Sequence, residues 1–78
     1  LIIEIKCFKT GDNWSAMKQN IDSKVQTYLQ NENYDFMIIF IYNPDLALKN
    51  TSMIESELST SQSINGKEFR VVAIVDPK

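Results

Sequence analysis

The residues best suited to chemistry in this sequence are Glu4 and Lys6, separated by one residue within the apolar segment 1–8, Leu-Ile-Ile-Glu-Ile-Lys-Cys-Phe. Because successive side chains of a strand point to opposite faces, Glu4 and Lys6 would share one face. A carboxylate and an ammonium are costly on an apolar surface unless they are paired, hydrogen-bonded or bound to a metal ion. The spacing therefore indicates either a structural ion pair or a functional site.

A helix is expected to follow this first strand. Asp12 stands where an N-cap residue would accept backbone N–H groups. Between residues 14 and 30, apolar side chains recur every three or four positions, which is typical of an amphipathic helix packed on a sheet. Trp14 lies on this apolar stripe, so we expect it in the core rather than stacked on a nucleic-acid base.

The central strand is expected at residues 34–42, an almost unbroken run of apolar residues, many of them β-branched or aromatic, that Asn43-Pro44 ends. A strand that is apolar on both faces is typical of a sheet covered on both sides, which favours parallel pairing. Joined to the first strand by a helix, it predicts a right-handed βαβ unit.

A second, shorter helix is expected at residues 52–60, after a connection at residues 45–50. Ser52 and Glu55 have the spacing of a capping box, in which each side chain accepts a hydrogen bond from the backbone N–H of the other residue. The polar residues 59–63 that follow are expected to form a loop.

The last strand is expected at residues 69–75, after a turn at Asn65-Gly66. The predicted fold class is thus α/β, with a three-stranded and mainly parallel sheet in β-α-β-α-β order and helices on its faces.

In open sheets of this class, functional groups gather beyond the carboxyl ends of the strands. The rule predicts one edge at which lysines meet the amino end of the first helix near Asp12, and both features favour anions such as phosphate. The lysines are Lys6 and Lys9, and Phe8, Tyr42 and Asn43 are expected at the same edge.

Length and composition limit the function classes. The 78 residues allow one small domain, and no apolar run approaches the roughly 18 residues of a membrane span, so a soluble protein is expected. Cys7 is the only cysteine and histidine is absent, which excludes an internal disulfide and a typical zinc site and fits the cytoplasm. Cys7 itself is expected to be an inert buried thiol. Because Leu1 already lies in a strand pattern, we expect the chain to be part of a longer polypeptide.

Together these segments resemble the PD-(D/E)xK restriction-endonuclease-like superfamily. The resemblance rests on Glu4-Ile5-Lys6 in an apolar strand, the Trp-containing helix, the run that ends in Tyr42-Asn43-Pro44 and the final Phe-Arg-Val-Val-Ala-Ile-Val strand. More narrowly, the chain is similar to the nuclease domain of the DpnII and MboI restriction enzymes, in which an E-x-K strand precedes a helix and then a strand ending in Tyr-Asp-Pro. By this resemblance, residues 1–78 would be the C-terminal part of a larger nuclease domain.

The resemblance implies a metal-dependent endonuclease that hydrolyses DNA phosphodiester bonds in bacterial defence. By the same resemblance, Glu4 would bind Mg²⁺ or Mn²⁺ together with the backbone carbonyl of Ile5. Lys6 would orient or activate the attacking water and offset charge on the phosphate. Lys9 and Asn43, expected at the same edge of the sheet, are further candidates for contact with the DNA phosphates.

Two features depart from the family pattern. The first metal-binding Asp of the superfamily lies on strands before the E-x-K strand, so the parent polypeptide would have to supply it, and residues 1–78 alone are expected to be inactive. Asn43 stands where the narrower family has the aspartate of Tyr-Asp-Pro, and Asp45 is a nearby substitute by adjacency only.

With a net charge of −2, the chain lacks the excess of basic residues expected of a nucleic-acid binder, so the parent would supply most contacts to the DNA backbone.

Two alternatives to the nuclease remain open. In the first alternative, Glu4 and Lys6 form a structural pair in a non-enzymatic interaction module whose unpaired first strand joins another chain, as in a homo-oligomer. In the second, the chain binds a phosphate or nucleotide, which ranks last because neither Gly11 nor Gly66 belongs to a glycine-rich loop.

Overall fold

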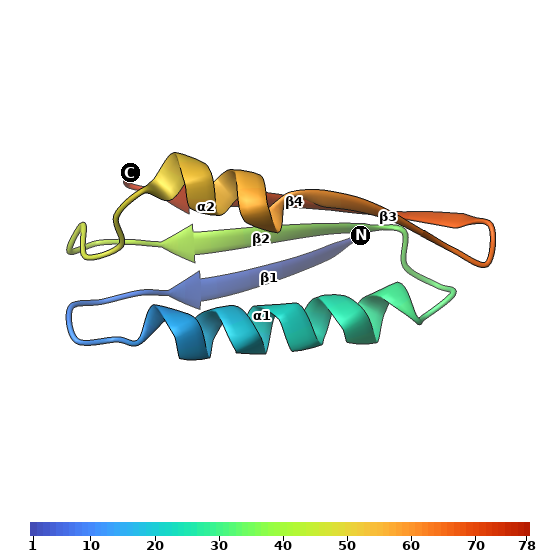
Figure 1. Ribbon diagram of the computed structural model, residues 1–78, viewed down its shortest axis with the longest axis horizontal. Coiled ribbons are helices and arrows are strands. Elements are labelled where there is room, and N and C mark those ends of the chain that lie inside the picture. Colours follow the sequence, from blue (N-terminus) through green and yellow to red (C-terminus); the bar gives the residue numbers. More distant parts are fainter.

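A computed structural model describes all residues from 1 to 78 as one four-stranded sheet with two helices (Figure 1). Neither helix combines the length and the apolar character that crossing a membrane requires. The elements in chain order are β1 (Ile2–Cys7), α1 (Trp14–Leu29), β2 (Phe36–Tyr42), α2 (Thr51–Leu58), β3 (Thr60–Ile64) and β4 (Lys67–Asp76).

The sheet is mixed, with the strand order β1-β2-β4-β3. β1 and β4 both pair with β2 in parallel, whereas β3 pairs with β4 antiparallel. The α/β class, the parallel βαβ unit and the central place of the strand at Phe36–Tyr42 are confirmed. The prediction of three strands is wrong, because the structure has four.

The strand missed by the sequence analysis is β3, with the sequence Thr-Ser-Gln-Ser-Ile. It forms a hairpin with β4 through Asn65 and Gly66, whose φ angles of +52° and +78° lie in the left-handed region that a tight hairpin turn requires. Its strand character comes from pairing with β4, because its own side chains carry almost no apolar alternation. The turn at Asn65-Gly66 was predicted correctly. The loop expected at residues 59–63 is wrong, because residues 60–63 belong to β3.

Both helices contribute to a single core on one face of the sheet. Register places Glu4 beside Ile39 and Ile39 beside Ala73, so these three side chains share that face. The predicted covering of both sheet faces is therefore wrong. The buried apolar residues are Phe8, Ile21, Val25, Leu29, Met37, Ile39, Ile41, Leu48, Ile54, Leu58, Phe69, Val71, Ala73 and Val75.

The opposite face of the sheet is uncovered. Ile5 on β1 is 70% exposed and Ile74 on β4 is 41% exposed, and they lie in one row with Phe40 between them. Cys7 lies on this same face and is exposed, so the expectation of a buried thiol is wrong. Sequence alternation correctly assigned Cys7 to the face opposite Glu4, but it did not predict which of the two faces the helices cover.

The helix starts differ from the predicted caps. Asn13, not Asp12, caps α1, because its Oδ1 accepts the Ala16 N–H at 3.1 Å. The Asp12 carboxylate instead accepts the Lys9 N–H at 2.8 Å and closes the turn after β1. α2 begins after Asn50, which adopts a left-handed φ of +52° and makes no side-chain capping bond.

The capping box expected at Ser52 and Glu55 does not form. Glu55 reaches across to β4, where its carboxylate accepts the Val75 N–H and the Lys78 ammonium, both at 2.8 Å. These two hydrogen bonds, led by that from Lys78, hold the pKa of the Glu55 carboxyl below its usual value. Glu55 thus fastens α2 to the carboxyl end of the sheet.

Candidate functional site

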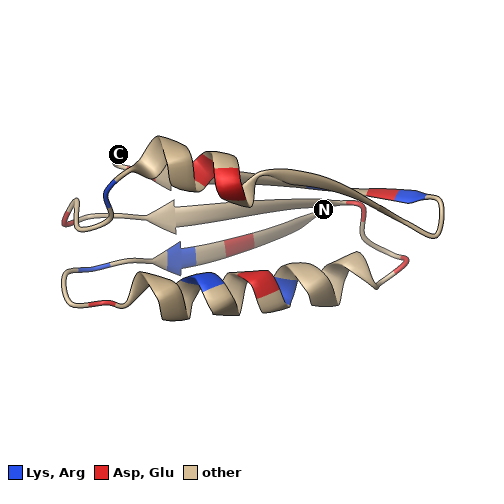
Figure 2. Cartoon of the chain, in the orientation of Figure 1, with Lys and Arg blue, Asp and Glu red and all other residues tan.

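Glu4 and Lys6 lie together on the helix-covered face of β1. The Lys6 Nζ is 3.6 Å from Glu4 Oε1, and about one fifth of each side chain is exposed, 21% for Lys6 and 18% for Glu4. Figure 2 shows these acidic and basic positions of β1 beside the charged stretch of α1. The geometry agrees with the shared face predicted from their spacing.

α1 contributes two more polar side chains to this pair. The Lys6 ammonium donates a hydrogen bond to Asn20 Oδ1 at 2.6 Å, and the Lys24 Nζ lies 3.2 Å from Glu4 Oε1. Asn20 and Lys24 are four residues apart, so they stand one helical turn from each other on the same side of α1. The sequence analysis missed both residues. Their i, i+4 spacing was the only signal, and it does not tell which strand they face.

The backbone of β1 adds an oxygen to the site. Phe8 N–H donates to the Tyr42 carbonyl at 2.8 Å, so the peptide groups of Phe8 point toward β2. Backbone groups alternate in direction along a strand, and β1 is the first strand of the sheet, so the carbonyl of Ile5 points to the open edge. The Ile5 carbonyl thus points away from β2, and whether it joins Glu4 in binding a metal ion stays a prediction.

A cleft opens beside Lys6 at the amino end of α1. It has a volume of about 390 Å³ and is lined by Lys6, Asp12, Asn13, Ala16, Met17 and Asn20. The first turn of α1 contains no acidic residue, and helix amino ends favour negative charge. The Lys6 ammonium and this end of the helix favour an anion in the cleft, whereas the Asp12 carboxylate in its lining opposes one.

The loops after β1 and β2 are tied together near this cleft. Asp45 Oδ2 accepts the Thr10 N–H at 3.1 Å, which links the loop after β2 to the loop after β1. Lys9 is exposed in the loop after β1, so its side chain is free to meet an approaching phosphate. A DNA contact of Lys9 stays a prediction.

Asn43 has a structural role at the end of β2. It is fully buried; its amide nitrogen donates to the carbonyls of Leu48 and Pro77, each at 3.1 Å, and its Oδ1 accepts the Leu48 N–H at 3.0 Å. These bonds connect the end of β2 to the segment after β4 and to the loop before α2. The DNA contact predicted for Asn43 is untested, and this geometry lends it no support.

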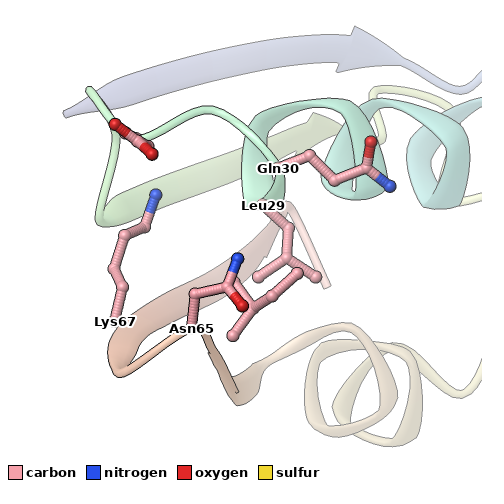
Figure 3. A pocket seen from close by; sticks show the side chains of 6 residues that line it. Leu29, Gln30, Asn65 and Lys67 are labelled. Atoms are coloured by element: carbon pink, nitrogen blue, oxygen red, sulfur yellow. The ribbon is translucent and has the colours of Figure 1, made fainter.

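A second hollow lies at the far end of the sheet and carries no comparable chemistry. Figure 3 shows Asn65 and Lys67 of the β3–β4 hairpin opposite Leu29 and Gln30 at the end of α1. The Lys67 ammonium is bonded to the Asn31 carbonyl and lies over the Phe69 ring, 5.7 Å from its centre. Nowhere does the chain bring three or more Cys, Asp or Glu side chains close enough to hold a metal ion by themselves.

The model of the family REase_DpnII-MboI, restriction endonucleases of the DpnII and MboI type, matches residues 1–78. No curated protein and no solved structure matches the chain. The family match spans every element of the structure, including β1 with Glu4 and Lys6, and it confirms the resemblance inferred from the sequence.

Proposed function

We propose, since this chain belongs to the DpnII/MboI family of restriction endonucleases, that Glu4 and Lys6 are catalytic residues of a metal-dependent nuclease that hydrolyses DNA. The observation that carries this proposal is the 3.6 Å approach of a carboxylate and an ammonium on one face of β1, beside the cleft at the amino end of α1. The family relation favours a restriction function in bacterial defence, within the cytoplasm.

The donor set of β1 fits a hard divalent cation such as Mg²⁺ or Mn²⁺. Glu4 would bind the ion through its carboxylate and Ile5 through its carbonyl, since oxygen ligands are those that Mg²⁺ prefers. When bound, the cation would polarise the phosphate and lower the pKa of a bound water. Glu4 is the only acidic residue of β1, and its charged partners are lysines, so we propose that a further acidic side chain completes the coordination.

Lys6 would act on the phosphate. Its ammonium lines the cleft at the amino end of α1, where it would offset charge that develops on the phosphate oxygens in the transition state. It would also orient a water molecule for attack on phosphorus. Exposed Lys9, in the loop after β1, would add a weaker contact to the DNA backbone.

We further propose that residues 1–78 form one α/β unit within a nuclease domain and do not cleave DNA by themselves. The charged neighbours of Glu4 are Lys6 and Lys24, both cations, so the carboxylate that would share the metal must come from elsewhere. Adding the remaining domain should restore cleavage.

The test is plasmid cleavage by the parent protein with Mg²⁺, comparing Glu4→Gln and Lys6→Met with the unchanged protein. Removal of either group should lower the rate by at least about 100-fold, as for other groups that stabilise transition-state charge. The matched control is Glu32→Gln, at an exposed position beside the second hollow, at the far end of the sheet from the cleft. Full cleavage by both site variants would remove the assignment.

A second candidate function, a non-enzymatic module that self-associates through β1, is favoured by the exposed edge of the sheet. Ile3 and Ile5 are 58% and 70% exposed, and the backbone groups of alternate residues point away from β2. If two copies paired antiparallel about Ile5, each Glu4 would lie opposite the partner copy's lysine at position 6. Registers centred on Glu4 or Lys6 would instead place like charges together.

Sedimentation of Ile5→Lys and Ile74→Lys distinguishes this candidate from the nuclease. Ile5→Lys places two lysines at the centre of the paired strands and should dissociate a dimer, whereas Ile74→Lys changes the same sheet face on β4 and should not. A monomeric parent at all concentrations, with cleavage lost in Glu4→Gln, would favour the nuclease.

A further inference from the structure

We propose that Lys24 is a built-in counter-ion for Glu4, which holds the carboxylate in the absence of metal and moves away when a divalent cation binds. This inference rests on the proposed function of Glu4. It assigns to α1 a role in controlling how tightly the site binds its cation.

The two lysines beside Glu4 are held differently. Both approach the same oxygen, Oε1, but Lys24 is nearer, at 3.2 Å, than Lys6, at 3.6 Å. The Lys6 ammonium is held by a 2.6 Å hydrogen bond to Asn20, whereas Glu4 is the charged group that Lys24 contacts. Lys6 is therefore anchored beside the cleft, and Lys24 is the cation nearer to the Glu4 carboxylate.

Exposure makes Lys24 the displaceable partner. Its side chain is 40% exposed, compared with 21% for Lys6, so its ammonium can turn into water on a flexible stem without leaving a buried charge. A divalent cation on Glu4 would repel this ammonium, and the repulsion is relieved when Lys24 swings outward. Lys24 thus competes with the metal ion for the carboxylate.

The experiment measures Mn²⁺ binding to the full-length protein from the electron paramagnetic resonance signal of free Mn²⁺. Lys24→Met removes the charge and keeps a long side chain that suits a helix. Lys24→Arg keeps the charge. Lys18→Met is the matched control, because Lys18 lies on the same helix but pairs with Asp22 at 3.3 Å. Thermal unfolding of each variant confirms that it is folded.

Lys24→Met should bind Mn²⁺ about two- to five-fold more tightly, the range that an exposed ion pair is worth. Lys24→Arg and Lys18→Met should bind as the unchanged protein does. Unchanged or weaker binding in Lys24→Met overturns the inference, as does equal tightening in Lys18→Met, which would show only an effect of net charge.

Glu4→Gln separates this inference from the function on which it rests. If Glu4→Gln weakens Mn²⁺ binding and Lys24→Met leaves it unchanged, only the role of Lys24 is lost. If Glu4→Gln binds Mn²⁺ as well as the unchanged protein, the metal site itself is misplaced and both proposals fail.

Discussion

Asn20 on α1 accepts a hydrogen bond from the Lys6 ammonium of β1 at 2.6 Å. Lys6 has several rotatable bonds, so without this bond its ammonium could move closer to Glu4 or away from the cleft. The contact joins residues 14 positions apart in the chain and fixes one of two side chains proposed to be catalytic. α1 is thus a support for the site as well as a part of the core.

This contact predicts that Asn20→Ala lowers the cleavage rate of the parent protein about tenfold, since misplacing a catalytic group by an ångström can cost up to about 100-fold. The loss should fall on kcat rather than KM if Asn20 positions Lys6. Asn20→Asp, which keeps an acceptor oxygen, should retain more activity. The control is Gln19→Ala at the adjacent exposed position, and an equal loss there would contradict a specific role for Asn20.

Glu55 predicts a pH dependence of stability. Its pKa is lowered in the folded protein, mainly by the hydrogen bond from Lys78, so its stabilising effect is fully present above the unfolded pKa of about 4.5. The effect is lost as the pH falls from there through the lower folded pKa. Glu55→Gln should destabilise the protein by about 1 kcal/mol at pH 7 and less at pH 3, measured by urea unfolding. Glu57→Gln, exposed on the same helix, should show no such difference.

Asn43 predicts that the aspartate of the related Tyr-Asp-Pro pattern is not tolerated here. Asn43→Asp would replace the amide that donates to the Leu48 and Pro77 carbonyls with a buried carboxylate that cannot donate when ionised. The expected cost is about 2–4 kcal/mol in the free energy of unfolding, measured by denaturant titration. If Asn43 contacts DNA instead, the variant would unfold normally and show weakened DNA binding.

The sequence predicted those elements whose signal is local. Apolar periodicity placed β1, α1, β2 and β4, and alternation placed Glu4 and Lys6 on one face. β3 was missed because Thr60–Ile64 becomes a strand only through pairing with β4. The bonds of Asn20 and Lys24 to β1 were missed because they depend on how α1 is rotated over the sheet, which spacing along the helix does not determine.

The reaction rate of the Cys7 thiol should report whether water reaches the uncovered face of the sheet. It lies on β1 on the same face as Ile5, and it is exposed. In the 78-residue chain its thiol should therefore react with a disulfide reagent such as Ellman's reagent at a rate within about threefold of that of the urea-unfolded chain, since access to the thiol limits the rate. Slow labelling at high protein concentration that quickens on dilution would show that a second copy covers this face. Slow labelling at every concentration would contradict the exposure of Cys7 and place the thiol in a folded core.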